Sequence, residues 1–179
     1  QLLRDTVSMM SKSQSDTVLA RFSSSTRRWF SSTFVAPTPV QQAAWQAIAS
    51  GEHALVIAPT GSGKTLAAFL TAIDTLFQFR TNQPSPARET TTRILYISPV
   101  KALAADVQRN LNLPLAGVYA ERQALNEPEI TLNIGMRSGD TPGAERARLV
   151  RRPPDILITT PESLRSEERR VGKECRSRW

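Results

Sequence analysis

A glycine-rich loop between an apolar run and a helical pattern constrains the fold of this chain more than any other feature. Residues 58–65 (APTGSGKT) follow the apolar run 54–58 (ALVIA), and the apolar positions of 66–79 recur with helical spacing. This order of strand, loop and helix is the context that the phosphate-binding pattern GxxxxGK[ST] requires, although Ala58 replaces its first glycine. We therefore predict a phosphate-binding loop, in preference to a glycine-rich turn that merely precedes a core helix.

The residue types of this loop match the chemistry of a nucleoside triphosphate. Gly61 and Gly63 can adopt backbone angles that other residues avoid, so that successive N–H groups point at phosphate oxygens. Lys64 can place its charge on the β and γ phosphates, and the Thr65 hydroxyl can bind Mg²⁺. Lys64 and Thr65 are therefore the predicted catalytic residues, and Thr65 is the predicted magnesium ligand.

Further apolar runs alternate with helical patterns along the chain. Continuous apolar runs are typical of strands that are buried on both faces of a parallel sheet. The runs that follow 54–58 are 94–98 (ILYIS), 132–136 (LNIGM) and 155–159 (DILIT), and the shorter predicted helices are 26–30, 101–111 and 143–150. The alternation predicts an α/β fold, a doubly wound parallel sheet with right-handed crossovers.

Several predicted helices begin with the same pair of residues, a Ser or Thr at the N-cap followed by proline. The pairs are Thr38-Pro39, Ser98-Pro99, Thr141-Pro142 and Thr160-Pro161. Ser98 and Thr160 also follow predicted strands, and a parallel sheet gathers its strand-to-helix turns at one edge, where ligands bind. That edge could hold nucleotide phosphates at one turn and a nucleic-acid backbone at others, although such pairs also serve simply as good caps.

Gln41 has two interpretations. With Thr38 it fits a capping box, in which its side chain accepts a hydrogen bond from the Thr38 N–H. The same amide could pair with the donor and acceptor edge of adenine. The pattern by itself favours the capping box.

Composition narrows the classes of function. The 179 residues include one Cys and one His, which excludes an internal disulfide and nearly excludes a Cys/His metal site. No apolar run is long enough to span a bilayer and no signal peptide is visible, so we expect no membrane partner and a reducing, cytoplasmic setting. The net charge of +7 permits a polyanionic partner but is weak evidence for one.

Residues 165–179 differ from the rest of the chain. They carry six Arg or Lys and three Glu, and they show neither helical nor strand periodicity. Every position matches the in-frame translation of a widely used short-read sequencing adapter. We therefore expect an artefactual tail, in preference to a basic nucleic-acid-binding tail or a solvated charge run.

Several long stretches between about Phe22 and Leu164 resemble the first motor domain of a superfamily 2 helicase, and more closely that of the Lhr (large helicase-related) family. These stretches are 28–30 (RWF), 37–41 (PTPVQ), 52–70 (EHALVIAPTGSGKTLAAFL), 93–111 (RILYISPVKALAADVQRNL), 137–142 (RSGDTP) and 153–164 (PPDILITTPESL). The resemblance implies a partial RecA-like P-loop domain at 34–164, after a Ser/Thr-rich extension at 1–33. It also implies ATP-driven movement along single-stranded DNA and 3′-to-5′ unwinding, including of RNA–DNA hybrids, with an association with DNA repair.

By this resemblance Gln41 belongs to an adenine-recognising motif, which reverses the preference for the capping box. The implied ATP-binding residues are Gln41, Thr60, Gly61, Ser62, Gly63, Lys64 and Thr65, and the implied nucleic-acid contacts are Pro99, Lys101, Ala102, Arg137, Thr160, Pro161 and Glu162. Contacts of this kind to the backbone suit a motor that must pass any base sequence. Alternatively, Lys101 is a solvated helix residue and Glu162 only complements a helix N-terminus. Trp29 and Phe30 are expected to be core anchors rather than neighbours of the adenine.

The acidic Asp-Glu-x-His motif, which the family uses to hold Mg²⁺ and to position the attacking water, is not among the 179 residues. One hypothesis is an ATP-dependent DNA helicase, represented by an N-terminal fragment that is inactive by itself. The alternative is an ATP- and nucleic-acid-binding module, without turnover, of another superfamily 2 helicase of the DEAD/DEAH RNA type. A P-loop transporter or kinase would not explain ISPVKALAADVQ or TTPESL.

Overall fold

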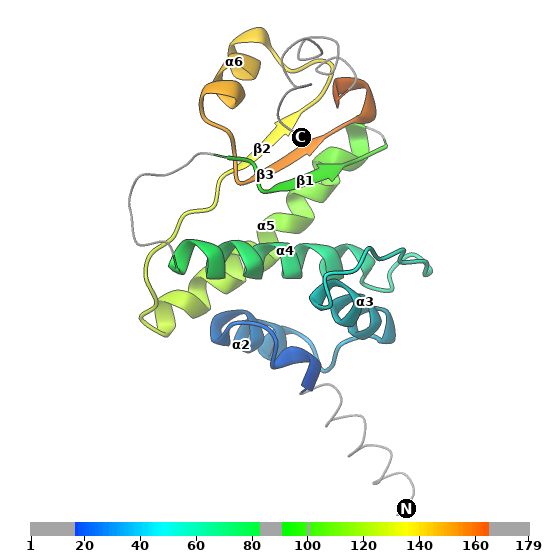
Figure 1. The fold of residues 1–179 in the computed structure, drawn as a ribbon, viewed down its shortest axis with the longest axis vertical. Helices are drawn as coiled ribbons and strands as arrows, with labels where there is room; N and C mark the ends of the chain where they lie inside the picture. Colours follow the sequence, from blue (N-terminus) through cyan, green and yellow to red (C-terminus); the bar gives the residue numbers. More distant parts are fainter. Residues whose placement is uncertain (1–16, 83–90, 100, 165–179) are drawn as a thin grey trace, which may run out of the picture. The chain divides into compact units, whose positions relative to one another are not determined.

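The computed structural model describes residues 17–82, 91–99 and 101–164, and it describes the side chains of 101–105 in no detail. The predicted tail 165–179 and the first part of the predicted extension, 1–16, therefore lie outside the described residues. In chain order the elements are α2 (Ser24–Thr33), α3 (Pro39–Ala49), α4 (Lys64–Thr81), β1 (Ile94–Ile97), α5 (Lys101–Ala124), β2 (Ile134–Arg137), α6 (Gly143–Arg151) and β3 (Ile156–Thr159), as labelled in Figure 1.

The chain divides into two compact units. The first unit comprises 1–82 and 111–129, and the second comprises 83–110 and 130–179. Helices α2, α3 and α4 and the later part of α5 belong to the first unit, whereas the three strands and α6 belong to the second. No helix among the described residues is both long enough and apolar enough to cross a membrane.

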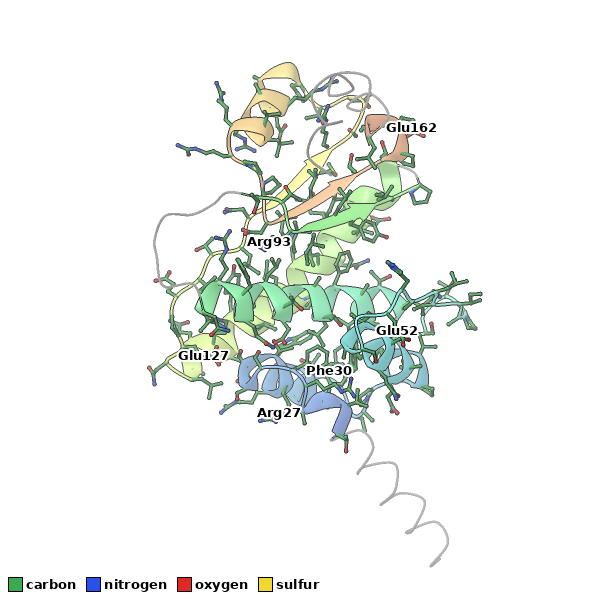
Figure 2. The ribbon with its side chains drawn as sticks, viewed as in Figure 1. Arg27, Phe30, Glu52, Arg93, Glu127 and Glu162 are labelled. Carbon is green, nitrogen blue, oxygen red and sulfur yellow. The ribbon has the colours of Figure 1, made fainter. Side chains whose placement is uncertain are left out.

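Aromatic side chains form the core of the first unit. Trp45 is 2% exposed, and its ring meets those of Phe22 and Phe30 edge-on at centroid distances of 4.9 Å and 5.5 Å. Its indole N–H donates to the backbone oxygen of Ala67 at 2.9 Å, which fixes α3 to the first turns of α4. Phe30, labelled in Figure 2, and Trp29 are both buried, so the prediction that they are core anchors is confirmed.

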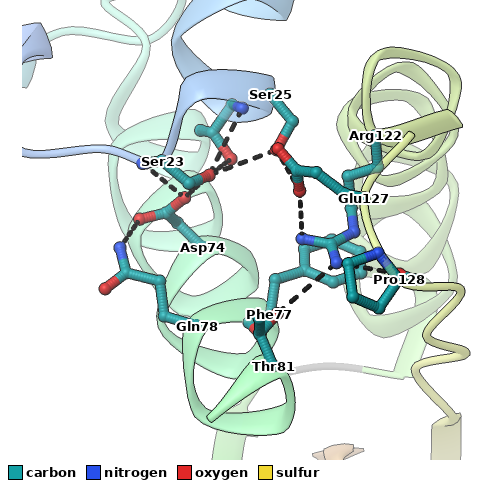
Figure 3. Close-up of polar contacts among 10 residues, drawn as sticks. Ser23, Ser25, Asp74, Phe77, Gln78, Thr81, Arg122, Glu127 and Pro128 are labelled. Atoms are coloured by element: carbon teal, nitrogen blue, oxygen red, sulfur yellow. Dashed lines mark hydrogen bonds and ion pairs between the residues drawn. The ribbon is translucent and has the colours of Figure 1, made fainter. Parts of the chain in front are cut away.

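Two buried charged side chains in the first unit are each met by several partners (Figure 3). Asp74 of α4 accepts hydrogen bonds from the Ser23 N–H and hydroxyl, at 3.1 Å and 2.5 Å, and from the Gln78 amide at 2.6 Å. Arg122 of α5 forms an ion pair of 2.7 Å with Glu127 and donates to the Thr81 hydroxyl of α4 at 3.4 Å. Because buried charges are costly unless they are paired, these contacts fix where α2 and the end of α5 lie against their neighbours.

Helix α5 is longer than the sequence predicts. The prediction ends at 111, but the helix continues through Pro114 to Ala124. Leu111, Leu115 and Val118 are all buried, and this helical spacing supports the continuation despite the proline. Gly117 allows the close packing of this helix, because a Cβ there would overlap the Trp29 indole.

The second unit contains a three-stranded parallel sheet in the order β1-β3-β2. Ile97 and Arg137, the last residues of the two outer strands, are both in register with Thr159 of the central strand. Three of the four predicted strands are thus confirmed, with ends shifted by one or two residues. Gly135 of β2 faces Leu149 of α6 and Pro154 so closely that a Cβ would lie 2.8 Å and 2.7 Å from their side chains.

The fourth predicted strand is not formed, and this prediction was wrong. Residues 54–58 have no strand structure, and Leu55 and Ile57 are 88% and 83% exposed. A strand requires a hydrogen-bonded neighbour, and the three described strands pair only with one another. The apolar run therefore indicates a segment that could be buried in a sheet. It does not indicate whether a partner strand is present.

Candidate functional site

The glycine-rich loop of the first unit has the backbone shape that its sequence predicts. Gly61 and Gly63 have φ angles of +81° and +86°, in the left-handed region that glycine favours. Gly63 is also the N-cap of α4, and no side chain caps that helix start. The loop therefore presents the beginning of α4 without a competing side-chain acceptor, as a phosphate site requires.

Lys64 lies across this loop. Its ammonium group donates to the backbone oxygens of Ala58 and, at 2.7 Å, of Pro59. Thr60 and Thr65 are exposed, so the Thr65 hydroxyl is accessible at the second residue of α4. The Ser62 hydroxyl is buried and has no hydrogen-bond partner among the described residues. In this loop the lysine has hydrogen-bond acceptors, but the buried Ser62 hydroxyl has no partner among the described residues. A phosphate oxygen could supply the missing partner, which agrees with a phosphate-binding loop.

Both interpretations of Gln41 start from the same geometry. The capping box is present: the Gln41 side chain accepts from the Thr38 N–H at 2.9 Å, and the Thr38 hydroxyl accepts from the Gln41 N–H at 3.3 Å. The Gln41 amide also donates to the Gly63 oxygen at 3.5 Å, and a Cβ at Gly63 would lie 2.5 Å from the same nitrogen. Gln41 is thus 3% exposed and lies directly against the loop. A capping box alone would not require this contact with the loop.

The sequence analysis missed a contact between Thr38 and the glycine-rich loop. Its hydroxyl donates to the backbone oxygen of Ser62 at 2.9 Å, across 24 positions of the chain. Thr38 and Gln41 together therefore hold two consecutive carbonyl groups of the loop. The sequence contains one indication of this contact, namely that Thr38 and Gln41 lie together in the stretch 37–41. A threonine at an N-cap does not by itself indicate a distant hydrogen-bond acceptor.

In the second unit, the carboxyl ends of the strands bring together most of the implied nucleic-acid contacts. The Ser98 N–H donates to the Thr159 oxygen at 2.8 Å, so the segments that follow β1 and β3 leave the sheet side by side. Pro99, Pro161 and Glu162 are exposed there, and Figure 2 labels Glu162 just beyond the end of β3. Thr160 is buried, and its hydroxyl lies 3.2 Å from that of Ser163. The expected clustering at one edge is confirmed for the turns after these strands, but the glycine-rich loop follows no described strand.

The remaining implied contacts differ in how far the structure describes them. Arg137 is half-buried at the end of β2 and is thus at the same edge. Lys101 and Ala102 are in the first turn of α5, but their side chains lie outside the described residues.

The sequence predicts that Thr141 caps α6, and this prediction was wrong. Pro142 is at the N-cap, no side chain caps the helix, and the Thr141 hydroxyl instead accepts from the Ser138 N–H at 2.8 Å. The reason is that Thr141 closes a turn directly after β2, in which its own N–H donates to the Ser138 oxygen at 3.2 Å.

Comparisons with known proteins agree with this arrangement. Residues 38–176 match the family model of the DEAD/DEAH box helicases. The chain is 58% identical over 144 residues to the Lhr helicase/uracil glycosylase of Escherichia coli, a match that covers 80% of this chain and 9% of that protein. It is 38% identical over 138 residues to the ATP-dependent helicase Lhr-Core of Methanocaldococcus jannaschii, with 77% of this chain and 16% of that protein covered. The chain thus spans less than a fifth of these relatives.

Solved structures give the same result for the fold. The structure of Mycobacterium smegmatis helicase Lhr bound to ssDNA and AMP-PNP aligns with a TM-score of 0.73 and 52% identity, over 82% of this chain and 18% of that chain. The DEAD-box helicase Mss116 bound to ssRNA and UDP-BeF aligns with a TM-score of 0.63 at 20% identity, over 86% of this chain and 29% of that chain, which bears on the fold alone. The predicted α/β, RecA-like fold class is therefore confirmed.

Proposed function

Because the chain belongs to the DEAD/DEAH box helicase family and its resemblance to the Lhr helicases is confirmed, we propose that it forms the ATP-binding part of a helicase. The complete protein would couple ATP hydrolysis to movement along single-stranded DNA or RNA–DNA hybrids in the cytoplasm, with 3′-to-5′ unwinding. The observation that carries this proposal is the contact of buried Gln41 with Gly63, which places an adenine-matching amide beside a phosphate-type loop.

The nucleotide site divides into parts with separate tasks. Gly61 and Gly63 shape the loop around the phosphates, and Gln41 would recognise the adenine edge. Lys64 would exchange the carbonyl oxygens of Ala58 and Pro59 for the β- and γ-phosphate oxygens, which carry more negative charge. The exposed hydroxyl of Thr65 would hold Mg²⁺, which neutralises charge on the β- and γ-phosphates when it is bound.

The strand edge of the second unit is the proposed nucleic-acid contact. The exposed residues Pro99, Pro161 and Glu162 flank buried Ser98 and Thr160 there. Two of these three exposed side chains are prolines, which have no hydrogen-bonding group that could read a base edge. Such a surface suits the sugar–phosphate backbone rather than the base edges, as a motor that passes any sequence requires.

A second candidate function is binding without turnover. The 179 residues contain no Asp-Glu-x-His motif, so the residue that would position the attacking water is missing from this sequence. We expect this chain by itself to bind ATP weakly and to hydrolyse it negligibly, even when single-stranded DNA is added.

Binding of a fluorescent ATP analogue to the purified chain, with and without Mg²⁺, tests the proposed site. Lys64→Ala should weaken binding about 100-fold, since a charged hydrogen-bond donor to phosphate is lost while the loop backbone is kept. The matched control is Arg27→Ala, which removes one positive charge from an exposed position of the same unit, labelled in Figure 2, and should change nothing. Equal affinity of the wild type and Lys64→Ala would refute the nucleotide site. DNA-stimulated ATP hydrolysis by the purified chain would refute the second hypothesis, that this chain binds ATP without turnover.

A further inference from the structure

The turn after β2, residues 138–141, is closed from within. Ser138 and Thr141 are 6% and 8% exposed, and two hydrogen bonds join them: the Ser138 N–H to the Thr141 hydroxyl at 2.8 Å, and the Thr141 N–H to the Ser138 oxygen at 3.2 Å. The two residues between them, Gly139 and Asp140, are exposed. The turn therefore has buried ends and an accessible tip.

The glycine at this tip is not explained by the fold. Gly139 is not among the glycines with positive φ, so its backbone conformation is open to other residues. A Cβ at Gly139 would meet nothing within 4 Å, whereas one at Gly135, four residues earlier, would meet Pro154 and Leu149. One physical use of a glycine that neither conformation nor internal packing demands is the close approach of another molecule to the backbone, and at Gly139 the space for it is open.

Arg146 of α6 holds this turn through two side-chain hydrogen bonds. Its Nε donates to the Thr141 oxygen and its Nη2 to the Gly139 oxygen, both at 2.7 Å. The planar guanidinium group can bridge two carbonyl groups in this way, whereas an ammonium group is a single point donor. The contact ties two carbonyl groups of the turn to the arginine, so the guanidinium group fixes the shape of the turn.

We propose that Arg146 is a positioning residue that keeps the tip of the 138–141 turn in the shape that receives the phosphate backbone of single-stranded nucleic acid. This inference rests on the proposed function, because the turn directly follows Arg137 at the end of β2 and so lies at the strand edge proposed above as the nucleic-acid contact. Arg146 acts through the turn: both of its described side-chain hydrogen bonds go to protein carbonyl groups, five and seven residues earlier in the chain.

The test is the affinity of the full 179-residue chain for fluorescein-labelled oligo(dT), measured by anisotropy over a series of NaCl concentrations. Arg146→Ala should weaken binding about tenfold, since two charge-assisted hydrogen bonds that shape the turn are lost. The slope of log affinity against log salt should stay that of the wild type, because no phosphate contact is removed. A lost direct phosphate contact would instead reduce this slope by about 0.7 for a single strand.

Arg148→Ala is the matched control. It removes the same side chain from the same helix, where Arg148 is exposed and forms an ion pair of 3.4 Å only with Glu145 among the contacts described. This variant should bind oligo(dT) nearly as well as the wild type. Both variants should keep the melting temperature and the affinity for the ATP analogue, which a general loss of structure would lower.

A second variant tests the turn without touching Arg146. Gly139→Leu should fold normally, since nothing lies within 4 Å of the added Cβ, but it should obstruct the approach of the strand and weaken oligo(dT) binding at least as much as Arg146→Ala. Full binding by Gly139→Leu, or equal binding by Arg146→Ala and Arg148→Ala, would overturn the role of Arg146 while leaving the proposed function intact. A wild-type chain that binds the ATP analogue but no oligo(dT) would overturn both the edge as a nucleic-acid contact and this inference.

Discussion

The two units hold their candidate site residues by different means. In the first, side chains reach across long stretches of sequence, as when Thr38 holds Ser62 and Trp45 holds Ala67. In the second, the register of parallel strands brings Ser98, Arg137 and Thr160 to one edge, and most of the hydrogen bonds that do so join backbone groups. The nucleotide loop should therefore be sensitive to single side chains that lie far from it in the sequence. The strand edge should tolerate such changes, apart from those in the local contact of Arg146 with the 138–141 turn.

The largest effect should come from Trp45→Ala. This ring is fully enclosed by Phe22 and Phe30 and also carries the hydrogen bond to Ala67, so its removal should lower the free energy of unfolding by about 3–5 kcal/mol. Urea unfolding followed by circular dichroism measures this. The control is Leu113→Ala in α5, where the side chain is 70% exposed and the change should be within about 0.5 kcal/mol. Similar midpoints for both variants would show that Trp45 does not hold the first unit together.

Ile158→Ala makes the corresponding change in the second unit. Ile158 is 0% exposed in the central strand, between Tyr96 and Met136 in register, and its truncation should cost about 2–4 kcal/mol. If the two units differ as argued, this variant should lower oligo(dT) affinity only through the unfolded fraction. A specific loss of oligo(dT) binding at a temperature where the variant is fully folded would show that side-chain packing also tunes the edge.

The same contrast explains which features the sequence could predict. Strands β1, β2 and β3 and the positive φ angles of Gly61 and Gly63 follow from local residue types, and the sequence predicts them. Pairing is not local: the run 54–58 is as apolar as the strands, yet it is exposed, because no described strand pairs with it. Hydropathy reports the preference of a segment for burial, and not the presence of its partner.

Other misses have the same cause. Helix α5 continues past both its predicted end at 111 and Pro114, although a proline normally interrupts a helix. The buried positions Leu115 and Val118 support the continuation, so tertiary packing outweighs a local preference. The contacts of Thr38 with Ser62 and of Arg146 with the 138–141 turn depend on where one element lies against another. The sequence thus indicates which residue types the candidate site uses, but not which side chains hold them in place.

Gly117→Ala tests the tight packing of the first unit with the smallest possible change. Alanine normally favours a helix over glycine, but the added methyl group would overlap the Trp29 indole, so a net loss of about 1–3 kcal/mol is expected. Gly139→Ala in the second unit is the matched control, since its Cβ meets nothing within 4 Å and the stability should be unchanged. Thermal unfolding of the two variants side by side measures the difference, and a stabilised Gly117→Ala protein would contradict the packing described for α5.

The smallest effect on stability, and the sharpest test of the nucleotide site, should come from Gln41→Ala. It removes the acceptor of the Thr38 N–H and the donor to the Gly63 oxygen, which should cost about 1 kcal/mol, the usual value of a cap interaction. Thr38→Val removes the hydroxyl that accepts from the Gln41 N–H and donates to the Ser62 oxygen, but it keeps the glutamine amide. If Gln41 recognises adenine, Gln41→Ala should lose the preference for ATP over GTP analogues in a binding competition, and Thr38→Val should retain it. If both variants lose stability equally and both keep the preference, Gln41 serves only as a cap. The proposed contact with adenine would then be wrong, although the loop and Lys64 could still bind phosphates.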